Sequence, residues 1–237
     1  MANKKKIEER GKVLRAKRSE RNIRFAGLGV LILLMIAGVW YFSPRERQTP
    51  ANVDFGDQTA CERFADIPVA AQYSEPPLNI DLTKQYFANV QMAKGGEFVI
   101  QLYADKAPKT VNSFIFLACK GYFEGVTFHR VLDGFMAQGG DPTGTGSGGP
   151  GYQFVNEDSD LTFDKAGVVA MANAGRDTNG SQFFITFVPR PDLNGGYTIF
   201  GQVVEGMDIV NAIKRRNPET NPTFQGDAIE SITISES

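Results

Sequence analysis

The chain has 237 residues, 42% of them hydrophobic; its 18 phenylalanines exclude a wholly disordered protein, and glycine without a three-residue period excludes collagen. Two cysteines and one histidine are too few for Cys₄, His₂ or His₃ metal sites, so we expect no metal and no cofactor. The net charge of −2 conceals an asymmetry, because residues 1–24 carry ten basic and three acidic side chains, a net of +7 that leaves −9 for the remainder.

The segment that follows the basic residues 1–24 decides whether their partner is anionic lipid or nucleic acid. Residues 25–42 contain no charged side chain, and as a helix they would extend about 27 Å, close to the ~30 Å hydrocarbon core of a bilayer. Trp40, Tyr41 and Phe42 gather at the far end, where aromatic side chains favour the membrane interface. We therefore predict a transmembrane helix, with the basic tail against anionic lipid and no nucleic-acid partner.

The orientation of this span follows from the positive charge in front of it. Because basic residues stay on the cytoplasmic side, residues 1–24 are predicted as a cytoplasmic tail and the residues after the span as extracytoplasmic. A cleaved signal peptide is the alternative, but its apolar region would be shorter and would end at small residues, whereas bulky and charged residues follow here. The sequence favours an uncleaved signal anchor in a single-pass protein of the cell membrane.

Two further regions follow the predicted span. Residues 43–79 contain five prolines and little regular apolar periodicity, which indicates a spacer with a short helix through Cys61–Phe64. Over residues 80–237, short β-rich runs alternate with glycine-rich turns. These runs predict one mainly β domain, a small antiparallel barrel or sandwich.

The elements of this domain are expected in a definite order. Tyr86–Lys94 and Glu97–Tyr103 form a hairpin about Gly95-Gly96, and a helix opens at Pro108. Further strands, a second helix and a closing strand are expected at Val126–Val131, Phe135–Gly139, Gly167–Ala172, Gln182–Phe187, Tyr197–Val204, Met207–Arg215 and Ala228–Ile234. Many short strands beside only two helices favour the barrel or sandwich.

Several features invite chemical interpretations that the sequence does not favour. Cys119 falls near the apolar face of the first helix, so we interpret it as a buried small hydrophobe, while a disulfide with Cys61 is left open. The glycine-rich run 144–149 is rejected as a dinucleotide loop because a proline and a glycine follow it and prevent a helix there. The run 175–181 lacks the lysine of a phosphate-binding loop.

Strand alternation gathers several chemistry-bearing side chains on one face. Successive side chains of a strand point to opposite faces, so Phe128 and Arg130 are expected on one face, with the intervening histidine on the other. By the same rule, Phe183 points away from the face that Gln182 and Phe184 share. One face can therefore offer a guanidinium, an amide and an aromatic ring, although a purely structural role explains the aromatic residues equally well.

The runs FHRVLDGFMAQGGD, MANAG and NGSQFFIT occur in the order and spacing of the cyclophilin family of peptidyl-prolyl cis-trans isomerases, which the chain resembles from Lys84 to Ile234. The resemblance implies a closed eight-stranded antiparallel barrel capped by two helices, with proline-containing polypeptides bound on its outer face. The catalytic residues that it implies by position are Arg130, His129 and Gln182. The substrate-binding residues that it implies are Phe135, Met136, Gln138, Ala172, Asn173, Phe184, Leu193 and Tyr197.

Two positions depart from the family pattern. Asp192 stands where many members have tryptophan. Tyr197 stands where animal cytosolic members typically have histidine, and in this the chain resembles many bacterial members. Because cyclosporin binding in the family depends on that tryptophan, we predict weak affinity for the drug. The resemblance places the pocket for the residue before proline mostly in the loops 143–152 and 174–178.

The chemistry that the resemblance implies can be stated physically. An X–Pro amide rotates slowly because rotation breaks the resonance of the C–N bond. A protein accelerates the rotation by binding the twisted form more tightly, which requires neither a nucleophile nor a metal. Arg130 is always protonated, so its donors suit the prolyl nitrogen or the neighbouring carbonyl oxygen. We expect an isomerase of exported or envelope proteins; a non-catalytic proline-peptide-binding or chaperone module on the same scaffold is the alternative.

Overall fold

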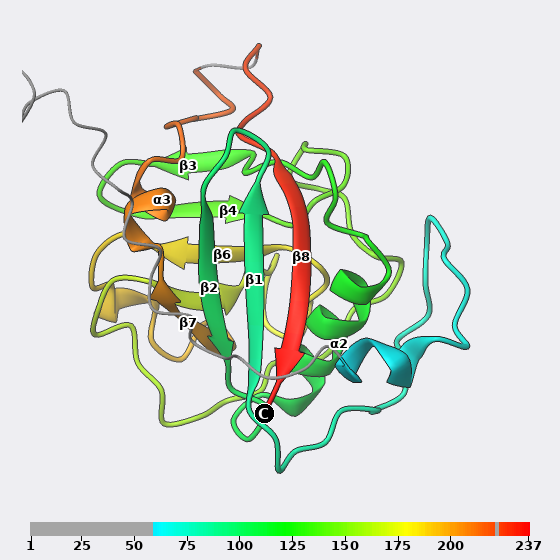
Figure 1. The fold of residues 1–237 in the computed structure, drawn as a ribbon. Coiled ribbons are helices and arrows are strands. Elements are labelled where there is room, and N and C mark those ends of the chain that lie inside the picture. Colours follow the sequence, from blue (N-terminus) through cyan, green and yellow to red (C-terminus); the bar gives the residue numbers. More distant parts are fainter. Residues whose placement is uncertain (1–58, 221–222) are drawn as a thin grey trace, which may run out of the picture. The chain divides into compact units, whose positions relative to one another are not determined.

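Eight antiparallel strands form one curled sheet in the part of the chain that the computed structural model describes, residues 59–220 and 223–237 (Figure 1). The strand order is β3-β4-β6-β5-β7-β2-β1-β8. The strands are β1 (Tyr86–Met92), β2 (Glu97–Leu102), β3 (Arg130–Leu132), β4 (Met136–Gly139), β5 (Val168–Met171), β6 (Phe183–Thr186), β7 (Ile199–Glu205) and β8 (Ile229–Glu236). The predicted mainly β class is confirmed.

The edge strands β3 and β8 form no ladder with each other in the described residues, so the fully closed barrel that was expected is corrected to a curled sheet. The edges meet at one end only, where Thr127 and Ala228 form an isolated bridge and the Phe128 amide donates to the Asp227 carbonyl at 2.9 Å. The strand expected from Val126 becomes regular only at β3, which leaves too few residues to complete a ladder.

The hairpin of β1 and β2 forms where the sequence predicts it. Gly95 and Gly96 have φ angles of 87° and 89°, which side chains with a Cβ rarely adopt. A Cβ on Gly96 would also lie 2.8 Å from a methyl carbon of Ile209. Buried and half-buried residues alternate along β1, as expected of a strand with one face in the core.

Helix α2 (Pro108–Cys119) begins at the predicted proline, whose missing N–H would have no partner at this position of a helix. A distant side chain satisfies the next two amides, because the Glu157 carboxylate accepts hydrogen bonds from the backbone of Lys109 at 2.9 Å and Thr110 at 2.8 Å. A negative charge at this end also interacts favourably with the helix dipole.

Helix α3 (Met207–Asn211) is shorter than the predicted helix Met207–Arg215. The Lys214 amide donates to the Asp227 carboxylate at 2.8 Å, and the backbones of Arg216 and Val131 exchange hydrogen bonds of 2.7 and 2.8 Å. Backbone groups bonded to neighbouring segments cannot continue the helical ladder, so the helix ends early. Figure 1 shows α2 and α3 on either side of the central hairpin.

The two faces of the sheet carry separate apolar clusters. Phe128 and Phe183 pack edge to face in the main core, with ring centroids 6.0 Å apart. Phe184 belongs to a smaller cluster, so the alternation predicted for residues 183 and 184 is confirmed. The face predicted to be shared by Phe128 and Arg130 is wrong, because Phe128 precedes the regular strand and points into the main core.

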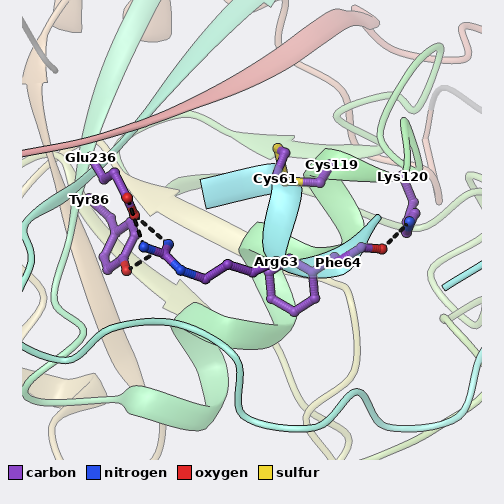
Figure 2. The surroundings of a disulfide bond; sticks show 7 residues. All are labelled: Cys61, Arg63, Phe64, Tyr86, Cys119, Lys120 and Glu236. Carbon is purple, nitrogen blue, oxygen red and sulfur yellow. Dashed lines mark hydrogen bonds and ion pairs between the residues drawn. A yellow bond between two sulfur atoms is a disulfide. The ribbon is translucent and has the colours of Figure 1, made fainter. Parts of the chain in front are cut away.

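The N-terminal segment (residues 59–79) packs against the domain. Its 3₁₀ helix η1 (Thr59–Phe64) lies where the sequence predicts a short helix. Figure 2 shows that Cys61 of η1 forms a disulfide with Cys119 of α2, which settles the pairing that the sequence left open. The interpretation of Cys119 as a buried small hydrophobe is corrected, because Cys119 is a partly buried half of this disulfide. Beside the disulfide, Arg63 donates to the carboxylate of Glu236, on β8, at 2.8 Å.

Within residues 59–220 and 223–237, no helix combines the length and the apolar character needed to cross a bilayer. The predicted cytoplasmic tail (1–24), the predicted signal-anchor helix (25–42) and the first part of the predicted spacer lie outside the described residues. The membrane anchor therefore stays a prediction.

Candidate functional site

Arg130, Gln138 and Phe184 are cross-strand neighbours on β3, β4 and β6. Arg130 pairs with Gln138, and Gln138 pairs with Phe184. Directly opposed residues of an antiparallel sheet point to the same face. The structure thus brings a guanidinium, an amide and an aromatic ring together on one face.

The Arg130 guanidinium is not committed to the fold. The other arginines in the described part of the chain each use the guanidinium in an ion pair or in hydrogen bonds to backbone carbonyls: Arg63, Arg176, Arg190, Arg215 and Arg216. Among the same described residues, Arg130 has no such partner, and its guanidinium carbon lies 5.6 Å from the centroid of the Phe135 ring. The ring attracts the cation without using its N–H donors, which stay available to a ligand.

An apolar cluster on the same face is built around Phe184. Its ring stacks on Phe163 at a centroid distance of 5.8 Å and meets Tyr197 edge-on at 5.3 Å. Met136 is buried in the cluster, and the half-buried Leu193 packs against it. Such a surface can bind a small apolar ring and keep water from the neighbouring guanidinium.

A second arginine, which the sequence analysis missed, also contacts Phe135. The guanidinium carbon of Arg190 lies 3.9 Å from the ring centroid, and Asp192 accepts hydrogen bonds of 2.8 and 2.6 Å from the same guanidinium. The carboxylate holds the cation over the ring, and this ion pair lowers the pKa of Asp192. The one signal in the sequence was the opposite charge two residues apart. Weak cyclosporin binding stays a prediction.

A groove of about 760 Å³ adjoins this cluster, because Gln138 lines the groove and neighbours Phe184 in the sheet. Gln182 organises its centre: the side-chain carbonyl accepts from Gln138 at 3.0 Å, and the amide donates to the carbonyls of Gly146 at 3.0 Å and Gly148 at 2.9 Å. The predicted site residues that line the groove are Gln138, Ala172, Asn173 and Gln182.

Asp141, a second residue that the sequence analysis missed, shapes the loop on one side of the groove. Its carboxylate is fully buried and accepts hydrogen bonds from the backbone amides of Thr143 at 2.7 Å, Gly146 at 2.6 Å and Gly148 at 3.1 Å. Burial alone would raise the pKa of Asp141, but these hydrogen bonds and that of the Thr143 hydroxyl outweigh it and lower the pKa. The carboxylate therefore fixes the loop as an anion.

His129 lies beneath the same loop. Only 2% of its surface is exposed, and a Cβ on Gly146 would lie 3.7 Å from its Nε2 atom. Burial disfavours the imidazolium and lowers the pKa of His129. A buried neutral imidazole in this place can support the groove loop without taking up a proton.

The predicted site residues therefore occupy adjoining places on one face. The apolar side holds Phe135, Met136, Phe184, Leu193 and Tyr197. The groove holds the polar residues, Arg130 lies at the junction and His129 is buried below. The catalytic and binding roles of these residues stay predictions.

Comparison with known proteins gives this geometry its context. Residues 87–234 match the family described as cyclophilin type peptidyl-prolyl cis-trans isomerase/CLD. Human peptidyl-prolyl cis-trans isomerase-like 1 is 53% identical over 122 residues, which are 50% of this chain and 74% of the relative. Peptidyl-prolyl cis-trans isomerase A of Mycobacterium tuberculosis is 49% identical over 160 residues, which are 59% of this chain and 87% of the relative.

Solved structures agree. A crystal structure of a cyclophilin type peptidyl-prolyl cis-trans isomerase from Cryptosporidium parvum has a TM-score of 0.58 and 34% sequence identity, covering 63% of this chain and 97% of its own. The same protein in the presence of the dipeptide Ala-Pro has a TM-score of 0.57. The matched residues include the site face, and relatives at about half identity are isomerases. The chain belongs to the cyclophilin-type peptidyl-prolyl cis-trans isomerase family and is an isomerase enzyme.

Proposed function

We propose that the chain accelerates rotation about X–Pro bonds with Arg130 as the catalytic residue. The observation that carries the proposal is the uncommitted guanidinium of Arg130 beside the apolar cluster of Phe184. The proline ring sits against that cluster, which brings the amide to the guanidinium. Arg130 then donates to the prolyl nitrogen, whose lone pair becomes localised as the bond twists and resonance is lost, or to the neighbouring carbonyl oxygen.

The remaining groups position the substrate. Gln138 and Gln182 hold the flanking backbone, and Asn173 adds a further polar group to the lining of the groove. His129 supports the loop and transfers no proton. No covalent bond forms between the substrate and the protein, so the rate gain comes from tighter binding of the twisted amide.

Activity measurements with the full chain test this assignment. In a protease-coupled assay on a short Ala-Pro peptide, Arg130→Ala is expected to lower kcat/KM at least about 100-fold, which is the effect of losing one strong transition-state donor. Arg215→Ala is the matched control, because Arg215 also lies over an aromatic ring, 4.2 Å from the centroid of Phe187, but its guanidinium is already paired with Asp133 and with backbone carbonyls. Turnover of Arg130→Ala at the rate of the control would contradict the proposal.

We further propose that the domain works outside the cytoplasm, tethered by residues 25–42, on exported or envelope proteins. The basic residues before that run and its lack of charge support the orientation. The Cys61–Cys119 disulfide also supports an oxidising compartment. Protease added to sealed, right-side-out membrane vesicles should digest the domain and spare the tail 1–24. Protection of the domain would contradict this topology.

A further inference from the structure

The N-terminal segment (residues 59–79) lies outside the family match, 87–234, yet both of its ends are fixed to the domain. At its start, the disulfide and the Arg63–Glu236 pair tie η1 to α2 and β8 (Figure 2). At its end, the Asn79 amide donates to the side chain of Asn112, on α2, at 2.9 Å. The covalent tie restricts how far the segment can move from α2.

Between these ends, residues 70–73 turn back onto the domain. Phe64 and Tyr73 both pack on Phe116 of α2, with ring centroids 5.5 and 5.0 Å away. Tyr73 is buried, and its hydroxyl accepts a hydrogen bond from the Ala70 amide at 3.0 Å. The position of the turn is therefore set by packing on the helix that carries the disulfide.

The same turn forms one side of the groove. The Tyr73 amide donates to the Pro150 carbonyl at 2.7 Å, and the Gln72 side-chain amide donates to the Gly149 carbonyl at 3.2 Å. Gln72 is exposed and lines the groove. A Cβ on Gly151 would lie 2.8 Å from the Gln72 side-chain oxygen, so glycine at this position permits the close approach.

The polarity of the groove gives Gln72 a defined chemical role. The side chains that line the groove within the described residues are all uncharged. The amide nitrogen of Gln72 is bonded to Gly149, which leaves its side-chain oxygen as an acceptor. Gln138 adjoins Phe184 in the sheet and lines the groove together with Gln72. A peptide whose proline contacts the Phe184 cluster would therefore extend past Gln138 into the groove, and its neighbouring residues would approach Gln72.

We propose that Gln72 is a specificity-determining residue of the isomerase. It accepts a hydrogen bond from a donor side chain, such as that of lysine or serine, at one of the two positions before the proline. The disulfide keeps Gln72 in place for this contact. The inference rests on the proposed seat of the proline in the apolar cluster, and it adds to the family site a residue from outside the matched region.

Opposite charges at position 72 test the proposal on the full, oxidised chain. The probes are proline peptides that carry Lys, Glu or Ala at each of the two positions before proline. Gln72→Glu should raise kcat/KM for the Lys peptide relative to the Glu peptide by up to about fivefold, the effect of an exposed ion pair, and Gln72→Lys should reverse the preference. The control variants Ser74→Glu and Ser74→Lys place the same charges two residues away, outside the groove.

The outcomes separate this inference from the proposed function. The Lys-to-Glu preference is also measured as a ratio of peptide affinities by fluorescence anisotropy. An absence of turnover would contradict the catalytic role of Arg130. The affinity ratios would still decide the role of Gln72. Ratios that shift only in the Gln72 variants support the inference. Ratios that stay constant, or that shift equally in the Ser74 variants, overturn it.

A second measurement tests the disulfide. In the Gln72→Glu chain, reduction of the Cys61–Cys119 bond should return the Lys-to-Glu ratio toward that of the unsubstituted chain, because the turn is released. Circular dichroism monitors that the domain stays folded during the reduction. If the Lys-to-Glu ratio does not change in the reduced, folded chain, the disulfide does not hold Gln72 in place and this part of the proposal is overturned.

Discussion

Two regions of the molecule use arginine in opposite ways. At the N-terminal segment, Arg63 donates to the buried carboxylate of Glu236 and to the hydroxyl of Tyr86. On the site face, Arg130 has only the ring of Phe135 beneath it and no carboxylate among the described residues within 4.0 Å. A guanidinium that stabilises the fold is paired within the fold, whereas one that serves a ligand keeps its donors unpaired.

The largest effect is expected at the paired arginine. Arg63→Ala leaves the Glu236 carboxylate buried without its main partner and should lower the free energy of unfolding by about 3 kcal/mol. The folded fraction should isomerise an Ala-Pro peptide at a rate within about threefold of the unsubstituted chain, because the partners of Arg63 are Tyr86 and Glu236 and neither belongs to the Phe184 cluster. Urea titration and the peptide assay measure the two quantities separately.

Arg176→Ala is the control for this experiment. Arg176 pairs with Asp158, but both side chains are more than half exposed. Because solvent screens such an exposed pair, its loss should lower the free energy of unfolding much less than the loss of Arg63 does. If the two substitutions lower the free energy of unfolding equally, the burial of Glu236 does not make its ion pair more important than an exposed one.

Acid should expose the same contrast. Hydrogen bonds from Arg63 outweigh burial and lower the pKa of Glu236 from 4.5 to about 2. Because the pKa is lower in the folded than in the unfolded chain, the pair stabilises the fold fully above pH ~4.5, and this stabilisation is lost as the pH falls toward about 2. The loss should amount to about 2–3 kcal/mol.

The measurement is a difference between two chains. The free energy of unfolding of the unsubstituted chain should exceed that of Glu236→Gln by a margin that shrinks between about pH 5.5 and about pH 2.5. A margin that is constant over this range would mean that Glu236 does not titrate as the ion pair requires.

The smallest effect is expected at Asp192. Its removal frees Arg190 from an exposed ion pair, so Asp192→Ala should change KM for an Ala-Pro peptide by no more than about threefold and leave kcat unchanged. Asp158→Ala, which removes the carboxylate of another exposed arginine pair, is the control. A large fall in kcat would mean that Arg190 acts in the reaction itself. Arg190 would then be an arginine that is paired within the fold and also serves the reaction, which the contrast between Arg63 and Arg130 does not include.

Local chemistry explains what the sequence predicted well. Gly95-Gly96 placed the hairpin, Pro108 opened α2, and alternation assigned Phe183 and Phe184 to opposite faces. These features depend on residues close together in the chain. The site residues came from a family resemblance, because nothing local distinguishes Arg130 from any other arginine.

The features that the sequence analysis missed depend on residues far apart in the chain. Helix α3 ends early because the backbone after it is hydrogen-bonded to Val131 and to the carboxylate of Asp227. Arg190, which precedes η2 (Pro191–Leu193), packs on Phe135, which precedes β4. The disulfide could not be predicted, because the presence of two cysteines in the sequence does not show whether they lie close together in the fold. Alternation failed at Phe128 because it applies only inside a regular strand.

The most direct test of the central claim measures binding and rotation on the same peptide. Exchange NMR on an Ala-Pro peptide gives the cis–trans rate in the bound state, and a titration gives Kd. Arg130→Ala should keep Kd within about threefold while the bound exchange rate falls at least about 100-fold, since the guanidinium stabilises the twisted amide rather than the ground state. An unchanged bound exchange rate in Arg130→Ala would contradict the account.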